Sequence, residues 1–289
     1  MSDILQRFLF ENAGVRGEVV QLDATWQAVL ERHEYPPTVR EVLGESMAAA
    51  ALLAATLKLK GSIILQVQGD GPISLLVVEC TAMGTLRGLA HWKGEVPAAD
   101  LYGRFGDGRL VITVDPGEGM ERYQGIVPLE GANLAEALDT YLARSEQLAT
   151  RLWLAADERR AGGLLVQRLP GAGPDADAWN RVTTLSATIT PAELLHLAPR
   201  EVMHRLFHEE DLRVFDAEPV SFRCSCTRER VENMLRRLGQ EEVTTLLHEQ
   251  GAITVNCDFC NQRYVFDSVD AAQLFLNDAM THQAAETRH

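Results

Sequence analysis

The sequence has no apolar segment long enough to cross a membrane, and it has little positive charge. Its longest apolar run covers residues 47–55, far short of the roughly 20 residues that span a bilayer. Its 27 Lys and Arg are outnumbered by 41 Asp and Glu, which gives a formal net charge of −14. Such an acidic chain repels nucleic-acid phosphates. We therefore expect no membrane association and no specific nucleic-acid partner.

Two common signatures are also missing. Gly103, Gly106 and Gly108 match neither a phosphate-binding loop nor a dinucleotide fingerprint, so they are interpreted as turn residues. Residues 1–12 lack the basic start and the long apolar core of a secretion signal. The sequence therefore predicts a cytoplasmic protein, in a compartment where cysteines stay reduced.

Cysteine is scarce, but four of the five cysteines are paired along the chain. Cys224 and Cys226 form a C-x-C motif, and Cys257 and Cys260 form a C-x-x-C motif. Four thiolates that arrive as two close pairs suit a tetrahedral Zn²⁺ ion. In a secreted protein the same residues could form structural disulfides, but in a reducing cytoplasm a metal or redox role is favoured. We predict one zinc ion per chain, bound by these four residues.

The C-x-C spacing is unusual for zinc and indicates redox chemistry. A disulfide between Cys224 and Cys226 would close a very small ring, and strained disulfides are labile. The fifth cysteine, Cys80, follows the strand-like residues 74–79. It is predicted to be a small buried apolar residue rather than a reactive thiol.

Two other metal patterns are weaker. His204 and His208 have the i, i+4 spacing of a metal pair, but no H-E-x-x-H motif accompanies them, so we expect a solvated helix face. His208 and Glu210 also imitate the H-x-E of zinc deaminases. That interpretation would leave Cys224 and Cys226 without a role, and Asn256 stands where a proline is expected.

Hydrophobic periodicity divides the first 170 residues into strands and helices. Strands are predicted at residues 17–23, 62–68, 73–78, 85–91, 109–114, 123–127, 148–156 and 163–169. Helices are predicted at residues 25–31, at 38–60 with a capping box at Thr38, and after a cap at Asn133. The second helix is apolar on all sides, so it should be central and buried. Residues 1–170 are therefore predicted to be an α+β core domain with a mainly antiparallel sheet.

Residues 171–223 are predicted to be a helical linker region that begins with a stretch rich in proline and glycine. One helix should begin after a cap at Thr190, and another at Pro199. The second helix has an apolar stripe formed by Val202, Met203, Leu206 and Phe207. The region is too short to form its own core, so this stripe is expected to cover the preceding domain.

Residues 224–289 are predicted to be a small zinc domain. Helices should follow Thr227 and Gly239, strands should lie at residues 253–255 and 264–266, and a last helix should begin at Ser268. Its expected apolar positions are Val231, Met234, Leu235, Leu238, Val243, Leu246, Leu247, Val269, Ala272 and Phe275. This small number of large apolar residues can form only a marginal core. Metal loss should therefore unfold the domain.

The cysteine segments resemble the 33-kilodalton heat-shock protein family, the redox-regulated bacterial holdase chaperones. The resemblance is strongest in residues 223–235 (RCSCTRERVENML) and 257–261 (CDFCN), with Tyr264 and Phe266. Residues 69–72 (GDGP), 123–129 (YQGIVPL) and 145–147 (SEQ) also match the family. The resemblance covers essentially the whole chain.

This resemblance implies a switch. In the reduced state the four cysteines would hold zinc and the chaperone would be inactive. Peroxide with unfolding stress, or hypochlorous acid, would form the disulfides Cys224–Cys226 and Cys257–Cys260 and release zinc. The linker region would then undock, and an oxidised homodimer would bind unfolded or misfolded client proteins without ATP.

Two other functional classes are possible. A constitutive zinc-ribbon module for nucleic acid is disfavoured because residues 224–289 contain six Arg, no Lys and ten acidic residues. A zinc hydrolase would need an open coordination position, which four sulfur ligands do not leave. A C-x-x-C oxidoreductase would need its pair at a helix N-terminus in a thioredoxin-like context. The chain is therefore not predicted to be an enzyme.

Overall fold

A computed structural model describes residues 3–56, 61–117, 119–145, 148–171 and 175–275. The predicted end of the apolar helix at Lys60, the Glu146-Gln147 part of one family motif, residues 172–174 of the linker and the C-terminal residues 276–289 lie outside the described residues. The chain divides into two compact units, Met1–Arg223 and Cys224–His289. Among the described residues, no helix is long and apolar enough to span a membrane.

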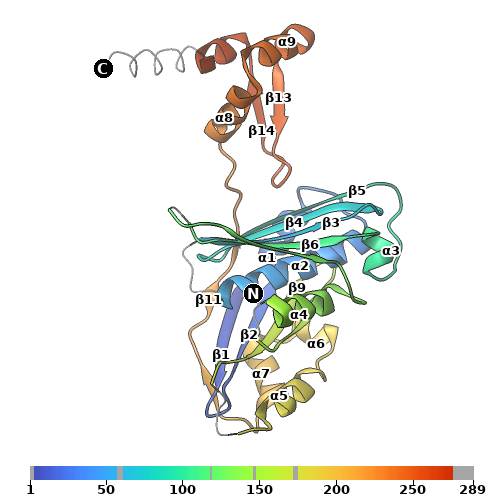
Figure 1. Cartoon of the computed structure of the whole chain (residues 1–289), viewed down its shortest axis with the longest axis vertical. Coiled ribbons are helices and arrows are strands. Elements are labelled where there is room, and N and C mark those ends of the chain that lie inside the picture. The colour runs from blue at the N-terminus through green and yellow to red at the C-terminus, as the bar shows by residue number, and fades with distance from the viewer. Residues whose placement is uncertain (1–2, 57–60, 118, 146–147, 172–174, 276–289) are drawn as a thin grey trace. The chain divides into compact units, whose positions relative to one another are not determined.

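Two six-stranded sheets organise the first unit (Figure 1). Sheet A has the order β10-β1-β2-β9-β8, and β11 also pairs with β1. Its strands are β1 (Ile4–Phe10), β2 (Val15–Leu22), β8 (Thr150–Ala156), β9 (Ala161–Arg168), β10 (Leu212–Val214) and β11 (Glu218–Pro219). All of its pairings are antiparallel.

Sheet B has the order β12-β5-β4-β3-β6-β7. Its strands are β3 (Ser62–Gln68), β4 (Ile73–Thr81), β5 (Thr85–Trp92), β6 (Arg109–Asp115), β7 (Tyr123–Pro128) and β12 (Ser221–Phe222). Only β12 pairs in parallel, along β5. The prediction of an α+β fold with mainly antiparallel sheets is therefore confirmed.

Helix α2 (Pro37–Thr56) lies between the two sheets, where Figure 1 shows it beneath sheet B. Its small side chains are buried on all sides, as the apolar sequence predicted. Gly44 allows a close approach to sheet A, because a Cβ there would lie 2.5 Å from the Ala156 Cβ. The predicted capping box at Thr38 is wrong. The helix already begins at Pro37, and the Thr38 hydroxyl instead donates to the Val96 carbonyl at 3.0 Å.

Three further helices complete this layer: α1 (Ala24–Leu30), α3 (Leu101–Phe105) and α4 (Leu134–Ser145). Asn133 caps α4, since its side chain accepts a bond from the Glu136 amide at 3.0 Å. The short helix α3, capped by Asp100, was not predicted. It precedes Gly106, whose φ of 65° explains why a glycine stands there.

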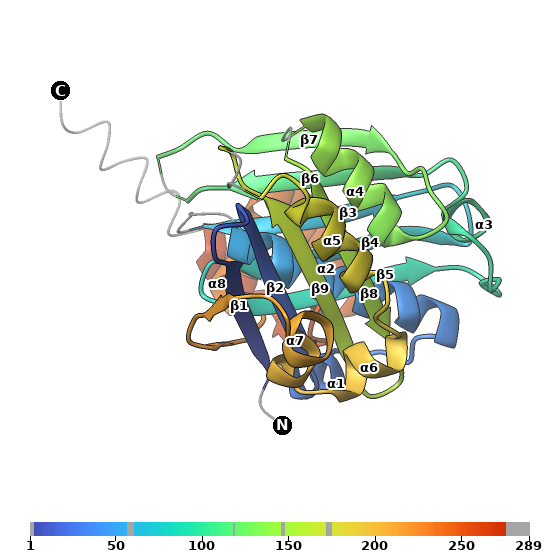
Figure 2. The same cartoon turned by 90° about the horizontal axis from the view of Figure 1, so that it is seen from below.

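Helices α5 (Ala178–Ser186), α6 (Pro191–His196) and α7 (Pro199–Phe207) pack over the other face of sheet A, as Figure 2 shows. The predicted cap at Thr190 is present, and Glu193 completes it as a capping box. The apolar stripe of α7 is buried in a second core together with Phe8 and Phe10 of β1. The linker helices therefore cover the preceding domain, as the sequence predicted.

An extended segment follows α7, and we call residues 211–223 the strap. Its first part pairs with β1 as β10 and β11, and its last part pairs with β5 as β12. In Figure 1 the strap is the pale orange segment that lies beside β1 and includes β11. One short stretch of chain thus lies along one edge of each sheet, while β8 and β7 form the opposite edges.

Glu18 of β2 should make the stability of the first unit depend on pH. Its side chain is 1% exposed, and its Oε2 has no hydrogen-bond partner among the described residues. Burial raises the pKa of Glu18 from 4.5 to about 8, although Arg16 and Arg7 oppose the shift. The native state therefore holds a proton that the unfolded chain releases, so stability should fall as pH rises from 4.5 to 8.

Glu18→Gln should remove this fall, because glutamine keeps the neutral form at every pH. We expect a gain of roughly 1–3 kcal/mol in the free energy of unfolding at pH 8 and little change at pH 5. Urea unfolding followed by tryptophan fluorescence measures both values. Parallel pH profiles of the variant and the wild type would contradict the assignment to Glu18.

The second unit contains α8 (Arg228–Leu238), α9 (Gln240–Gln250), β13 (Ile253–Asn256), β14 (Arg263–Phe266) and a helix at residues 268–275. Its buried side chains are few: Leu235, Val243, Ile253, Phe266, Ala271 and Leu274. The predicted positions Met234, Leu238, Val269 and Ala272 are wrong, because these side chains are exposed. In the last helix the buried face is formed by Ala271 and Leu274, with Phe275 partly buried against the core.

Candidate metal centre

The four predicted cysteines come together in the second unit. Cys224 and Cys226 directly precede α8, and Cys257 and Cys260 lie in the turn between β13 and β14. The four Sγ atoms all lie within 4.8 Å of one another. The distance between Sγ atoms is 3.6 Å for Cys224 and Cys257, and 3.3 Å for Cys226 and Cys260. In the described part of the chain, no other group of three or more metal-ligating side chains is this close.

Local backbone interactions position both pairs. Thr227 caps α8 by accepting a bond from the Arg230 amide, which fixes the chain just after Cys226. In the second pair, the Asn261 amide donates to the Cys257 carbonyl at 2.7 Å, and the Cys257 amide donates to Gln262 at 3.0 Å. Asn261 has a φ of 57°, a left-handed conformation that asparagine tolerates better than most residues. The tight turn holds both sulfur atoms on one side.

The donor set fits a zinc ion. Tetrahedral zinc with Zn–S bonds of about 2.3 Å places its sulfur ligands roughly 3.8 Å apart. The separations of 3.3 and 3.6 Å found here are close to that value. They are also too long for disulfides, whose S–S bond is about 2.05 Å. The arrangement matches a four-sulfur metal shell built from reduced cysteines.

The shifted pKa values of three of these thiols also favour a bound cation. Burial opposes the Cys224 thiolate, but hydrogen bonds from the Cys226 amide and from neighbouring thiols outweigh burial and lower its pKa to about 7. Burial raises the pKa of Cys260, and the neighbouring sulfur atoms raise it further. Burial also raises the pKa of Cys257. A metal-free cluster therefore disfavours four thiolates, whereas a bound dication would favour all of them.

Two residues around the cluster have roles that the sequence did not reveal. The Tyr264 hydroxyl donates to Sγ of Cys226 at 3.3 Å, a contact typical of the outer shell of a metal site. The guanidinium of Arg228 lies 4.3 Å from the centre of the Phe266 ring and pairs with Asp270 at 2.8 Å. Arg228 thereby joins α8 to β14 and to the last helix. Both residues belong to the quoted family motifs, but spacing alone assigned them no contact.

The remaining candidates behave as ordinary structural residues. His204 and His208 lie on the exposed face of α7, with ring centres 5.9 Å apart. The prediction of a solvated helix face is therefore confirmed. Cys80 is 2% exposed in β4, and burial raises its pKa to about 12. The prediction of a small buried residue is therefore confirmed.

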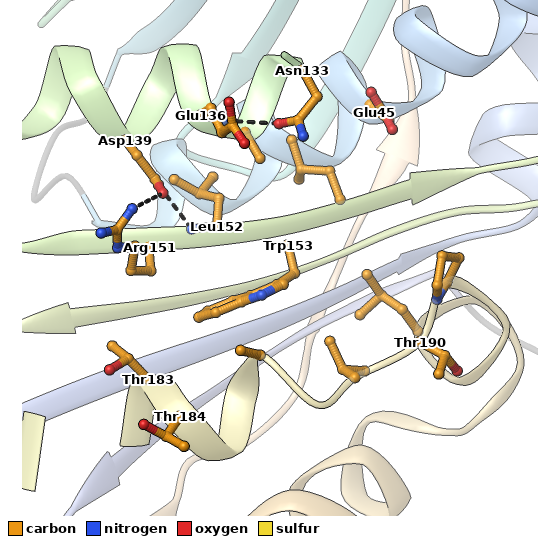
Figure 3. A pocket seen from close by; sticks show the side chains of 16 residues that line it. Glu45, Asn133, Glu136, Asp139, Arg151, Leu152, Trp153, Thr183, Thr184 and Thr190 are labelled. Carbon is orange, nitrogen blue, oxygen red and sulfur yellow. Dashed lines mark hydrogen bonds and ion pairs between the residues drawn. The ribbon is translucent and has the colours of Figure 1, made fainter. Parts of the chain in front are cut away.

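A cavity of about 660 Å³ with both polar and apolar walls lies in the first unit, between α4, β8 and the helices α5 and α6 (Figure 3). Asp139 is engaged there, because it accepts bonds from Arg151 at 3.1 Å and from the Leu152 amide at 2.9 Å. Trp153 and Thr183 also line the cavity. The linker helices thus cover sheet A without filling the space beneath them.

Comparisons with known proteins agree with these features. The family model described as Hsp33 protein matches residues 3–267. Proteins named 33 kDa chaperonin from Nitrosococcus oceani and Methylobacillus flagellatus are each 53% identical, over 99% and 96% of both chains. The crystal structure of a 33 kDa chaperonin from Thermotoga maritima is similar with a TM-score of 0.83 and 26% identity, covering 96% of this chain and 99% of that one.

Proposed function

The chain belongs to the Hsp33 family of chaperones, and we propose that it is a redox-regulated holdase that works without ATP. It is inactive while Cys224, Cys226, Cys257 and Cys260 are reduced and bind one zinc ion. Oxidation of these cysteines activates it to bind unfolding proteins. The observation that carries the proposal is the cluster of four Sγ atoms within 4.8 Å in a unit with a very small core.

The metal centre would connect parts of the second unit that its own core holds only weakly. A bound Zn²⁺ would supply positive charge that stabilises four neighbouring thiolates and fixes their geometry. The residues themselves join the start of α8 to the β13–β14 turn. Thiolates are also the form that oxidants attack, so the same residues that stabilise the fold can sense peroxide.

Oxidation would convert the four thiols into the disulfides Cys224–Cys226 and Cys257–Cys260. Each disulfide forms with the loss of two electrons, which reduce one hydrogen peroxide to two waters. This pairing follows the family, whereas the contacts at 3.6 and 3.3 Å in the structure join Cys224 to Cys257 and Cys226 to Cys260. Both cysteine segments must therefore rearrange during oxidation. Once the disulfides have formed, no thiolate remains to bind a metal.

Loss of the second unit's fold would release the linker region, residues 171–223. Two features support a region that is docked yet detachable. The cavity of about 660 Å³ shows that α5 and α6 are incompletely packed on the domain of residues 1–170. The strap keeps most of its side chains exposed and leads directly into Cys224. Release would expose apolar residues of sheet A and of α7 to clients.

The partners follow from this mechanism. Clients would be unfolded or misfolded proteins, and the oxidised, active form would be a homodimer. We place the protein in the cytoplasm, where reduced cysteines can retain a metal until oxidants appear. Nucleic acid is not proposed as a partner, and no enzymatic reaction is assigned.

The decisive experiment compares light scattering of thermally unfolding luciferase in the presence of the reduced, zinc-loaded protein and of the peroxide-treated protein. We expect suppression of scattering by the oxidised form only. Cys80→Ala is the matched control and should keep the switch, because Cys80 is buried in the first unit. Equal protection by both redox forms of the wild type would refute the switch.

A further inference from the structure

The strap is attached to both sheets by its main chain. Along β1, the Glu11 amide donates to the Asp211 carbonyl at 2.9 Å, and the Phe215 amide donates to the Arg7 carbonyl at 3.0 Å. Along β5, the Ser221 amide donates to the Gly84 carbonyl at 2.9 Å, and the Arg223 amide donates to the Leu86 carbonyl at 3.1 Å. These bonds close two sheet edges that would otherwise present unpaired backbone groups.

The side chains of the strap add little to this attachment. Within residues 211–223 only Val220 is buried, and Leu212 and Phe222 are partly buried. The ion pairs at its rim, such as Arg213 with Glu11 at 2.6 Å, are exposed and therefore weak. The centre of the Phe222 ring also lies 4.3 Å from the Arg32 guanidinium carbon. Most of the attachment is nevertheless made by main-chain bonds, which depend little on sequence, and binding to varied unfolding proteins requires this.

An apolar cavity lies behind the buried residue of the strap. It measures about 350 Å³ and is lined by Ala51, Ala54 and Ala55 of α2, by Cys80, and by Pro219 and Val220 of the strap. Small residues on the wall leave room for a side chain larger than valine. Recognition by strand addition commonly combines main-chain bonds with a pocket for one side chain.

We propose that clients bind at the edges of β1 and β5, where an extended segment of the unfolding protein replaces the strap as an added strand. An apolar side chain of the client enters the cavity behind Val220. The strap is thus an internal competitor that resembles a client. This inference rests on the proposed function, because oxidation must first release the strap.

The first test uses synthetic peptides of residues 211–223 with the oxidised, full-length protein. One peptide carries N-methyl groups on Phe215, Ser221 and Arg223, the residues whose amides face the two edges. A matched peptide carries them on Leu212, Val214 and Phe222, whose amides alternate with these and point away. The unmodified peptide and the matched peptide should compete with luciferase for the chaperone. The peptide methylated on Phe215, Ser221 and Arg223 should compete at least about tenfold more weakly. Equal potency of the two methylated peptides, or no competition by the unmodified peptide at millimolar concentration, overturns the proposal.

The second test follows hydrogen exchange at the Glu11 amide, which the strap protects in the reduced protein. Oxidation should expose this amide, and added client or unmodified peptide should protect it again. An amide that stays protected after oxidation, or that the client leaves exposed, overturns the proposal. Protection of the Glu11 amide that returns after oxidation without any client also overturns the proposal, because the strap of a second copy would then occupy the edge. Failure of the oxidised protein to protect luciferase would refute the proposed function instead, while peptide binding would still report on the edge.

Discussion

Removing the metal from the reduced protein is expected to unfold residues 224–275 while the domain of residues 1–170 keeps its structure. The described part of the second unit buries only six side chains, all of moderate size except Phe266. A core of this size does not normally hold a domain together. Structural zinc contributes roughly 10–16 kcal/mol in small zinc domains, which exceeds the whole stability of most domains. This is the largest single effect that we predict.

The distribution of aromatic residues makes this result easy to measure. All four tryptophans, at positions 26, 92, 153 and 179, belong to the first unit. Trp179 lies in α5, so a change in tryptophan emission during chelation would report release of the linker helices. Loss of exchange protection at the amides of α8, α9, β13 and β14 reports unfolding of the second unit itself. Cys257→Ser should show the same exposed amides without any chelator, and Cys80→Ala should not. Protection of the α8 amides that survives chelation would contradict the prediction.

Periodic segments of the fold could be predicted because the order of apolar and polar residues within each segment indicates which face is buried. Except for β1, which was not predicted, the longer strands of both sheets alternate or run apolar over six to nine residues, and α2 is apolar on every side. The proximity of the cysteines could be predicted for a related reason. Each pair lies within one short turn, so only the meeting of two turns had to be inferred.

The strap could not be predicted, because its own side chains carry no strand pattern. Most of them are exposed, and Asp216 and Glu218 give the segment the composition of a loop. Its extended conformation is set by hydrogen bonds to β1 and β5, which precede it by more than one hundred residues. The residue pattern within the strap contains no information about strands so distant in the sequence. The Tyr264 contact with Cys226 was missed for the same reason, since 38 residues separate the two.

The errors at Thr38 and Val269 show where local rules compete with tertiary contacts. Thr38 has the right spacing for a capping box, but the helix starts one residue earlier and its hydroxyl bonds to Val96. Val269 is more apolar than its neighbour Ala271, yet it is 62% exposed while Ala271 is buried. In a helix with so few apolar residues, the packing of α8, α9 and Phe266 decides which face turns inward.

Phe207→Ala is expected to activate the reduced, zinc-loaded chaperone without any oxidant. Phe207 is 1% exposed, and its ring centre lies 4.9 Å from that of Phe10 and 5.8 Å from that of Phe8. Removing a buried ring of this kind costs about 3–5 kcal/mol. If α5–α7 dock as one removable layer, that loss raises the undocked population by roughly 10²–10³-fold. Light scattering of unfolding luciferase then reports protection under reducing conditions.

A matched variant separates release of the linker from general loss of stability. Phe105 of α3 is also fully buried in the first unit, but it packs in the core between the sheets and away from α5–α7. Phe105→Ala should lower the urea midpoint to a similar extent and leave the reduced protein inactive. Activation by both variants would mean that any destabilisation exposes client-binding surface, and the linker region would lose its special role. Activation by Phe207→Ala alone would show that the contact between α7 and sheet A holds the chaperone in its inactive state.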